Sequence, residues 1–323
     1  MQNVVSRKHT NSKALTSRNN KQQQETTTTR RQFIMSSQLG AAAPALTAVN
    51  KANVAAYILN VLVTFGIGGR SNAIISEKYQ SLVTPSGWAF SIWGVIFLAQ
   101  AVFTVVQTRP DYSNHVLVQK GVGYKYAVAC IFQAMWTICF TEFEYISLSF
   151  VAMSGILISL WTLFVDQRVY SSNSKKDGDT AATSSNTTNL LLVFPFSIHF
   201  GWIMAAWLVN LNVVLVAAGG SELQQLILAA LSLLIIWFLG VYVTNIMKPP
   251  SFTIGLVMLW TALGITAELT NPIDSIAREF HRKMLDMGRN AAAMACLSLS
   301  LMCLMAYFVP DDRVPRVSER KTK

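Results

Sequence analysis

The sequence carries little charge. Lys, Arg, Asp and Glu make up 13% of the 323 residues, whereas a soluble domain usually has about 25%. Hydrophobic residues reach 52%, so an ordinary soluble fold is excluded and an all-α integral membrane protein is expected. The formal charge of +10 would suggest nucleic acid in a soluble protein. Here the basic residues lie between the apolar runs and in the two tails, so no nucleic-acid partner is expected.

Signatures of catalysis and metal binding are also missing. The sequence has no Gly-rich phosphate loop, no nucleophile elbow and no histidine–carboxylate cluster with ligand spacing. Its four cysteines lie within apolar runs without metal-ligand spacing, which indicates buried small hydrophobes; they are Cys130, Cys139, Cys296 and Cys303. We therefore expect no enzyme and assign no catalytic or metal-binding residue.

Residues 1–50 differ in composition from the rest of the chain. They are rich in Ser, Thr, Asn, Gln and basic residues, and Glu25 is their only acid. Such a segment cannot bury enough apolar surface to fold, so a disordered tail is expected. Its composition is typical of a transit peptide, for a plastid ahead of a mitochondrion, with cleavage between Ala41 and Lys51. A cytosolic tail is the alternative. A second basic tail is expected at 310–323.

Apolar runs long enough to cross a bilayer follow one another along the chain. We predict about eight membrane helices, at 52–69, 88–108, 126–141, 146–166, 190–215, 223–246, 251–268 and 290–309. Eight spans would place both termini on one side, together with 20 of the 26 Lys and Arg residues. The connection at 168–189 is expected to be a flexible loop.

The fifth run has no charged residue but keeps polar and aromatic ones. Pro195, His199, Trp202, Ala206 and Asn210 are spaced by three or four residues, which places them on one face of a helix. Polar groups are costly in hydrocarbon, so this face is expected to turn toward neighbouring helices or a cavity.

The second run has an aromatic face of the same kind. Phe90, Trp93, Phe97 and Gln100 share one side of the predicted helix, whereas Trp88 points elsewhere and suits the membrane interface. Aromatic residues often only pack helices together. Two such segments in one chain nevertheless favour a shared cavity.

These residues resemble the TspO/MBR family of tryptophan-rich sensory and translocator proteins. The resemblance covers about residues 52–215 and rests on two signatures and a pair, namely Pro85, Trp88, Phe90, Trp93 and Phe97; Phe194-Pro195-Phe196 with Gly201-Trp202, Ala206 and Asn210; and Gln133 with Trp136. Phe97 and Phe196 stand where the family commonly has Tyr, and Gln133 stands where it has Asn. Three further helices at 216–309 suggest its longer branch.

The resemblance implies a five-helix bundle at 51–215 around a pocket for tetrapyrroles or sterol-like lipids, with loop 70–87 as a lid. It carries over Trp88, Phe90, Trp93, Trp136, Pro195, Trp202, Ala206 and Asn210. Phe97, Gln100, Gln133 and His199 complete the expected ligand-binding set. His199 departs from the family pattern; it is expected either to bond a neighbouring helix or to ligate the metal of a bound haem or other porphyrin.

Three functions remain open at this stage. A membrane receptor or carrier for a planar hydrophobic ligand is preferred, since stacking on Trp and Phe would bind it. A secondary transporter is the alternative, because Pro195 fits a broken helix near the membrane centre. An enzyme acting on a lipid or pigment ranks third. Membrane lipid and a hydrophobic small molecule are the expected partners, and a homodimer is a further expectation.

Overall fold

The computed structural model describes residues 45–67, 72–176 and 185–308, and every regular element among them is a helix. The expected all-α fold is therefore confirmed. The predicted transit segment and the predicted C-terminal tail lie outside the described residues, except for 45–50.

Eight long helices occur in the described part, close to the eight predicted runs. Several continue into a turn of another helical type. They are α2 (Ala48–Leu62) with a π-turn (Val63–Ile67), a 3₁₀ turn (Gly87–Ser91) with α4 (Ile92–Val106), α6 (Lys125–Thr137) with a π-turn (Ile138–Glu142), α7 (Ile146–Lys176), a π-turn (Asn189–Val193) with α9 (Phe194–Ala217), α10 (Glu222–Val241) with a π-turn (Tyr242–Ile246), α11 (Phe252–Thr270) and α13 (Arg282–Phe308). Short helical segments lie between them: α3 (Asn72–Lys78), α5 (Pro110–Ser113), a π-turn (Leu117–Val122), α8 (Ser185–Thr188) and α12 (Asp274–Glu279).

Seven of these helices are long and apolar enough to cross a membrane. The chain is thus a multi-pass membrane protein. The exception is α6 with its π-turn, which carries Lys125 and Glu142 at its ends and Gln133 in its middle. It packs against both α2 and α7, which are among the seven. Eight spans, and both termini on one side, remain predictions.

The last helix begins earlier than predicted, at Arg282 instead of residue 290. The charges in its first two turns suggested a loop, but Asp286 pairs with Arg282 at 3.9 Å and with Arg289 at 3.2 Å. Pairs at these spacings stabilise a helix by a few tenths of a kcal/mol each. The charged segment therefore starts the helix.

The fold also begins slightly before the predicted boundary at residue 51. The Thr47 hydroxyl accepts from the Asn50 backbone N–H, and the Asn50 side chain accepts from the Thr47 backbone N–H. This capping box fixes the start of α2 at Ala48. A cleavage that keeps this cap would fall before Thr47.

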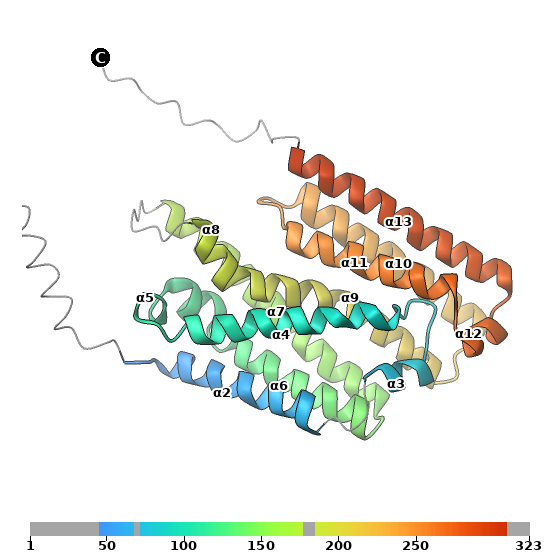
Figure 1. The fold of residues 1–323 in the computed structure, drawn as a ribbon, viewed down its shortest axis with the longest axis horizontal. Coiled ribbons are helices and arrows are strands. Elements are labelled where there is room, and N and C mark those ends of the chain that lie inside the picture. The colour runs from blue at the N-terminus through green and yellow to red at the C-terminus, as the bar shows by residue number, and fades with distance from the viewer. Residues whose placement is uncertain (1–44, 68–71, 177–184, 309–323) are drawn as a thin grey trace, which may run out of the picture. The chain divides into compact units, whose positions relative to one another are not determined.

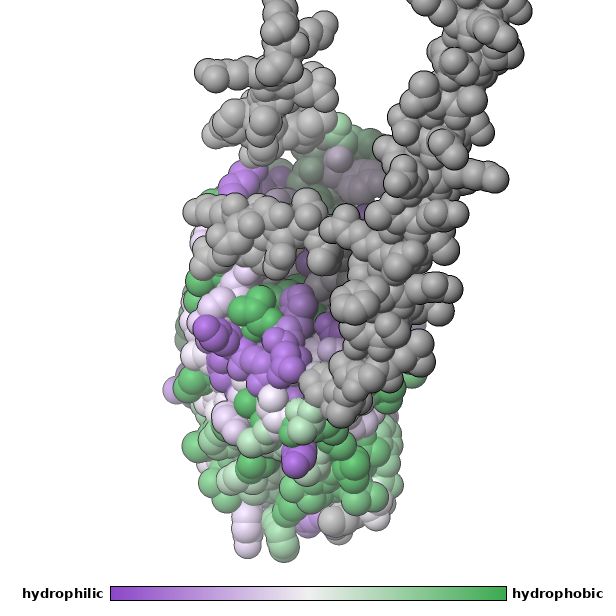
Figure 2. Space-filling view, turned by 90° about the vertical axis from the view of Figure 1, so that its left-hand side faces the viewer, coloured by the Kyte–Doolittle hydropathy of each residue, from purple (hydrophilic) through white to green (hydrophobic). Residues whose placement is uncertain are grey.

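Helix α2 buries amides and exposes apolar residues. Asn50, Asn53 and Asn60 are fully buried, whereas Leu62 and Phe65 are more than half exposed. This is the reverse of the arrangement in a soluble protein. It suits a helix whose outer face contacts lipid and whose polar side chains face the interior. Figure 2 shows a separate division on the surface, with hydrophilic residues grouped on the face toward the viewer, at one end of the helices, and hydrophobic residues below them.

The described residues from Leu46 form one compact unit. Helices α2, α4, α6, α7 and α9 pack together. Helices α10 and α11 pack beside them against α9, and α13 packs against α10 and α11 (Figure 1). Gly201 lets α9 approach α11 closely, because a Cβ there would lie 3.2 Å from the Cβ of Val257. Asn212 joins α9 to α10 by donating to the Ser232 hydroxyl at 2.8 Å. The predicted domain boundary near residue 215 stays a prediction.

Candidate ligand-binding cavity beneath the first loop

A small cavity of about 40 Å³ lies where α4, α6, α7, α9 and α11 meet the first loop. Its lining is almost wholly apolar and aromatic. The lining residues are Ser76, Pro85, Phe90, Trp93, Trp136, Phe140, Met153, Trp202, Ala205, Ala206, Val209, Asn210, Val213 and Thr261. None of them carries a formal charge, so shape, stacking and hydrogen bonds are the means of recognition available here.

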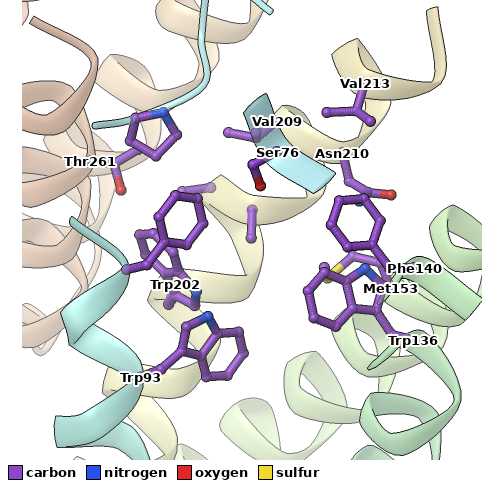
Figure 3. Close-up of a pocket in the computed structure, with 14 residues that line it drawn as sticks. Ser76, Trp93, Trp136, Phe140, Met153, Trp202, Val209, Asn210, Val213 and Thr261 are labelled. Atoms are coloured by element: carbon purple, nitrogen blue, oxygen red, sulfur yellow. The ribbon is translucent and has the colours of Figure 1, made fainter. Parts of the chain in front are cut away.

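The cavity has two aromatic walls (Figure 3). Trp93 and Trp202 form one wall, with ring centroids 6.3 Å apart and planes nearly perpendicular. Trp136 and Phe140 form the other, stacked at 5.1 Å with an interplanar angle of 13°. Figure 3 shows Asn210 near the second wall, at the end where Ser76 of the first loop approaches. The walls offer flat faces from three different helices.

The first loop is fixed on one side by the turn between α6 and α7. The Lys78 ammonium group and the Tyr79 hydroxyl both donate to the Glu144 carboxylate. Hydrogen bonding to Glu144 raises the pKa of the exposed Lys78. Ile75 and Val83 are buried and anchor the loop to the apolar interior.

Helix α11 fixes the other side of the loop. The Gln80 amide donates to the Glu268 carboxylate at 2.6 Å, and the Ser86 backbone N–H donates to the Gly264 carbonyl at 3.0 Å. Gly264 is needed for this approach, because a Cβ there would lie 2.9 Å from the Cβ atoms of both Pro85 and Ala89. The cavity is thus covered by a segment that two different parts of the bundle hold in place.

Three polar atoms of the lining residues are buried without a hydrogen-bond partner among the described residues. They are the indole nitrogens of Trp136 and Trp202 and the side-chain oxygen of Asn210. Together they supply two donors and one acceptor. An unsatisfied buried polar group destabilises a fold by about 1–3 kcal/mol, so ligand groups that pair with these atoms would bind favourably.

A hydrogen-bonded group lies next to the Trp93–Trp202 wall. Gln100 of α4 places its amide nitrogen 2.8 Å from Nδ1 of His199, and its amide oxygen accepts from Tyr126 at 3.3 Å. The imidazole is in edge contact with Trp93, at a centroid distance of 5.8 Å. All three members of this group are buried.

The structure brings half of the expected binding residues together. Phe90, Trp93, Trp136, Trp202, Ala206 and Asn210 line the cavity. Gln100, His199 and Phe97 lie behind Trp93, with the Phe97 ring 6.0 Å from it. Gln133 and Pro195 are buried outside the lining. Trp88 is 45% exposed and packs on Trp260. It therefore points away from the aromatic face of α4, as its spacing predicted.

Sequence reasoning missed several lining residues. Phe140 follows Trp136 by one helical turn, and Val209 and Val213 continue the face of Trp202, so spacing alone would have found them. Met153 and Thr261 have no such signal. Thr261 belongs to α11, which the sequence placed outside the pocket.

A larger groove lies elsewhere, between α10 and α13. It encloses about 760 Å³ and is lined by Leu82 of the first loop and by residues of the two helices that are apolar except for Ser298. Met287 and Met294 on its rim are 71% and 70% exposed, so the groove is open to its surroundings. Its one indole is already paired, because Trp237 donates to the Ser298 hydroxyl at 3.1 Å.

No group of three metal-ligating side chains occurs in the part of the chain that the structure describes. Seven apolar helices and a covered aromatic cavity define a multi-pass helical membrane protein with an internal cavity. Residues 47–305 match the family TSPO-like protein, so the chain belongs to that family. The match extends beyond the expected 52–215 and includes α10, α11 and most of α13. No match was found among curated proteins or solved structures.

Proposed function

We propose that the protein is a membrane receptor or carrier that binds a hydrophobic planar ligand, a tetrapyrrole or a sterol-like lipid, beneath the first loop. The observation that carries the proposal is the meeting of three indoles, two of them with unpartnered N–H groups, beside the unpartnered oxygen of Asn210. Aromatic contacts contribute about 0.5–1.5 kcal/mol each beyond simple burial. Membership in the TSPO-like family supports the same assignment.

Binding a tetrapyrrole requires the cavity to open. Ligand pockets usually enclose roughly 300–1,000 Å³, and the closed cavity encloses about 40 Å³. The first loop is the segment suited to move, because solvent screens the exposed Lys78–Glu144 ion pair, which therefore restrains the loop only weakly. Because the two aromatic walls belong to α4, α6 with its π-turn, and α9 and not to the loop, a tetrapyrrole would also require the Trp93–Trp202 wall to move apart from the Trp136–Phe140 wall.

Titration of the full-length protein in detergent with protoporphyrin IX tests the proposal. We expect a saturable shift of the porphyrin Soret band and quenching of tryptophan fluorescence with the same midpoint. Absence of both changes, for the porphyrin and for a fluorescent sterol, would reject the proposal. The same preparation addresses the alternatives, since counterflow in liposomes would indicate a transporter and chemical turnover of the ligand an enzyme.

A further inference from the structure

Three buried side chains from three helices form a hydrogen-bonded chain beside the cavity. Gln100 of α4, Tyr126 of α6 and His199 of α9 are each at most 1% exposed. The Tyr126 hydroxyl donates to the Gln100 amide oxygen at 3.3 Å, and the Gln100 amide nitrogen lies 2.8 Å from His199 Nδ1. We call this set the Tyr126–Gln100–His199 chain.

The chain determines which imidazole nitrogen carries the proton. An amide nitrogen can only donate, so His199 Nδ1 must accept. A neutral imidazole has one N–H, which is therefore on Nε2. Tyr126 supports this arrangement because its own donation holds the amide oxygen of Gln100 away from His199. Gln100 and Tyr126 are thus positioning residues for the His199 proton.

The Nε2–H group has no hydrogen-bond partner among the described residues. His199 lies one turn before Trp202 on α9 and against the ring of Trp93, and both indoles line the cavity. The Trp202 indole N–H is unpartnered as well. Two neutral donors therefore lie within one helical turn, and the described residues that line the cavity include no lysine or arginine.

We propose that His199 Nε2–H is a ligand-recognition donor, fixed by the Tyr126–Gln100–His199 chain, that selects ligands carrying an oxygen acceptor, a carboxylate or a carbonyl. This inference rests on the proposed function and specifies its ligand. A ligand that enters between the indoles displaces Trp93 and reaches the donor. The same tautomer has no lone pair on Nε2, so His199 does not ligate the metal of a bound porphyrin.

The tautomer can be measured without any ligand. ¹⁵N NMR of the full-length protein labelled at its histidines, with His199→Phe used for assignment, should show a neutral ring protonated at Nε2. Gln100→Leu should remove this preference, and Gln167→Leu, which removes a buried amide that donates to the Leu192 carbonyl outside the chain, should leave it intact. A ring protonated at Nδ1 would mean that the side-chain amide of Gln100 is flipped, with its oxygen facing His199. This result would overturn the inference.

Ligand selection is tested with two porphyrins that differ in their acceptors. Protoporphyrin IX has two carboxylates, and octaethylporphyrin has none. His199→Phe should weaken protoporphyrin IX binding about ten- to a hundredfold, the range of a hydrogen bond to a charged group. Binding of octaethylporphyrin should change less than threefold, and Gln167→Leu should change the binding of neither porphyrin.

Equal losses for the two porphyrins, or no loss for either, would overturn the assignment of His199 as a selecting donor. A wild-type protein that binds neither porphyrin nor a sterol would instead reject the proposed function, and the ligand assignment with it. Low-spin ligation of haem that disappears in His199→Phe would contradict the Nε2-protonated tautomer directly.

Discussion

The cavity beneath the first loop and the groove between α10 and α13 differ in size and in chemistry. The groove encloses about 760 Å³ and the cavity about 40 Å³. The groove is rimmed by exposed methionines, and its Trp237 indole is already hydrogen-bonded. The cavity is covered, and Trp136, Trp202 and Asn210 each keep an unpartnered polar atom there.

This difference shows that volume alone does not identify the site. In a membrane, an open apolar groove loses little by contacting lipid tails, because hydrocarbon surrounds it in any case. Buried polar atoms without partners are unfavourable and gain from a ligand that pairs with them. These unpartnered atoms are the reason why the small covered cavity, and not the larger groove, is the proposed site.

Among the variants that test the cavity against the groove, Trp202→Ala should reduce porphyrin affinity the most. It removes a stacking face and an N–H donor and leaves a void, so porphyrin affinity should fall about a hundredfold or more. Trp93→Ala should cost about tenfold, because the partly buried ring supplies only one face of the wall.

Trp237→Phe in the groove is the matched control, together with Trp88→Phe at the exposed pair with Trp260. Both should change affinity less than twofold in the same Soret titration, with monodispersity in detergent as the folding check. A larger loss in Trp237→Phe than in Trp202→Ala would move the site to the groove.

Gly264→Ala should loosen the cover of the cavity. The added Cβ would lie 2.9 Å from Pro85 and Ala89, and overpacking of this kind destabilises by about 1–3 kcal/mol. The melting temperature in detergent should fall, and the porphyrin dissociation rate should rise about tenfold. Gly94→Ala is the control, since a Cβ at that position meets nothing within 4 Å. Equal behaviour of the two variants would show that α11 does not hold the loop.

Glu268→Gln should have a smaller effect of the same kind. It weakens the charge-assisted hydrogen bond from Gln80, so the dissociation rate should rise about two- to fivefold with little change in melting temperature. Asp274→Asn alters an exposed carboxylate nearby and should leave both quantities unchanged. Stopped-flow release of bound porphyrin measures the rate, and a Glu268→Gln value equal to wild type would argue against this contact as a restraint.

Loss of the Lys78–Glu144 ion pair should have the smallest effect on loop closure, and it should appear as a dependence of closure on pH. In the folded protein, the hydrogen bond to Glu144 raises the pKa of Lys78 above its usual value of 10.5. Its contribution to loop closure is therefore fully present below about pH 10.5 and is lost as the pH rises through the raised pKa. A fluorophore on the first loop should report constant closure from pH 6 to 9 and opening above pH 10.5. Lys78→Met should remove this transition; a transition that persists in the variant would assign it to another group.

The sequence predicted the helices, and half of the residues that it proposed for the pocket line the cavity, because most of both predictions follow from periodicity. The run at 190–215 has no charge and repeats its polar residues every three or four positions, so its helix and its inner face were evident. Trp136 was predicted from the family resemblance. Phe140 was missed, although it lies one helical turn after Trp136 and its spacing would have predicted it.

The remaining features depend on tertiary packing. Thr261 reaches the cavity only because α11 packs against α9 at Gly201. The contacts of Gln80 and Lys78 join residues far apart in the chain, and no local pattern marks them. The predicted start of α13 was wrong because a helical turn with paired charged residues has the same amino-acid composition as a solvated loop.

Photo-crosslinking tests most directly that the ligand lies beneath the first loop and not in the larger groove. A porphyrin bound to the full-length protein is illuminated, and the modified peptides are identified by mass spectrometry. We expect modification within 85–93, 136–140 and 202–213, and we expect it to be reduced in Trp202→Ala. Modification confined to 226–237 and 284–298 would place the ligand in the groove between α10 and α13 and contradict this account.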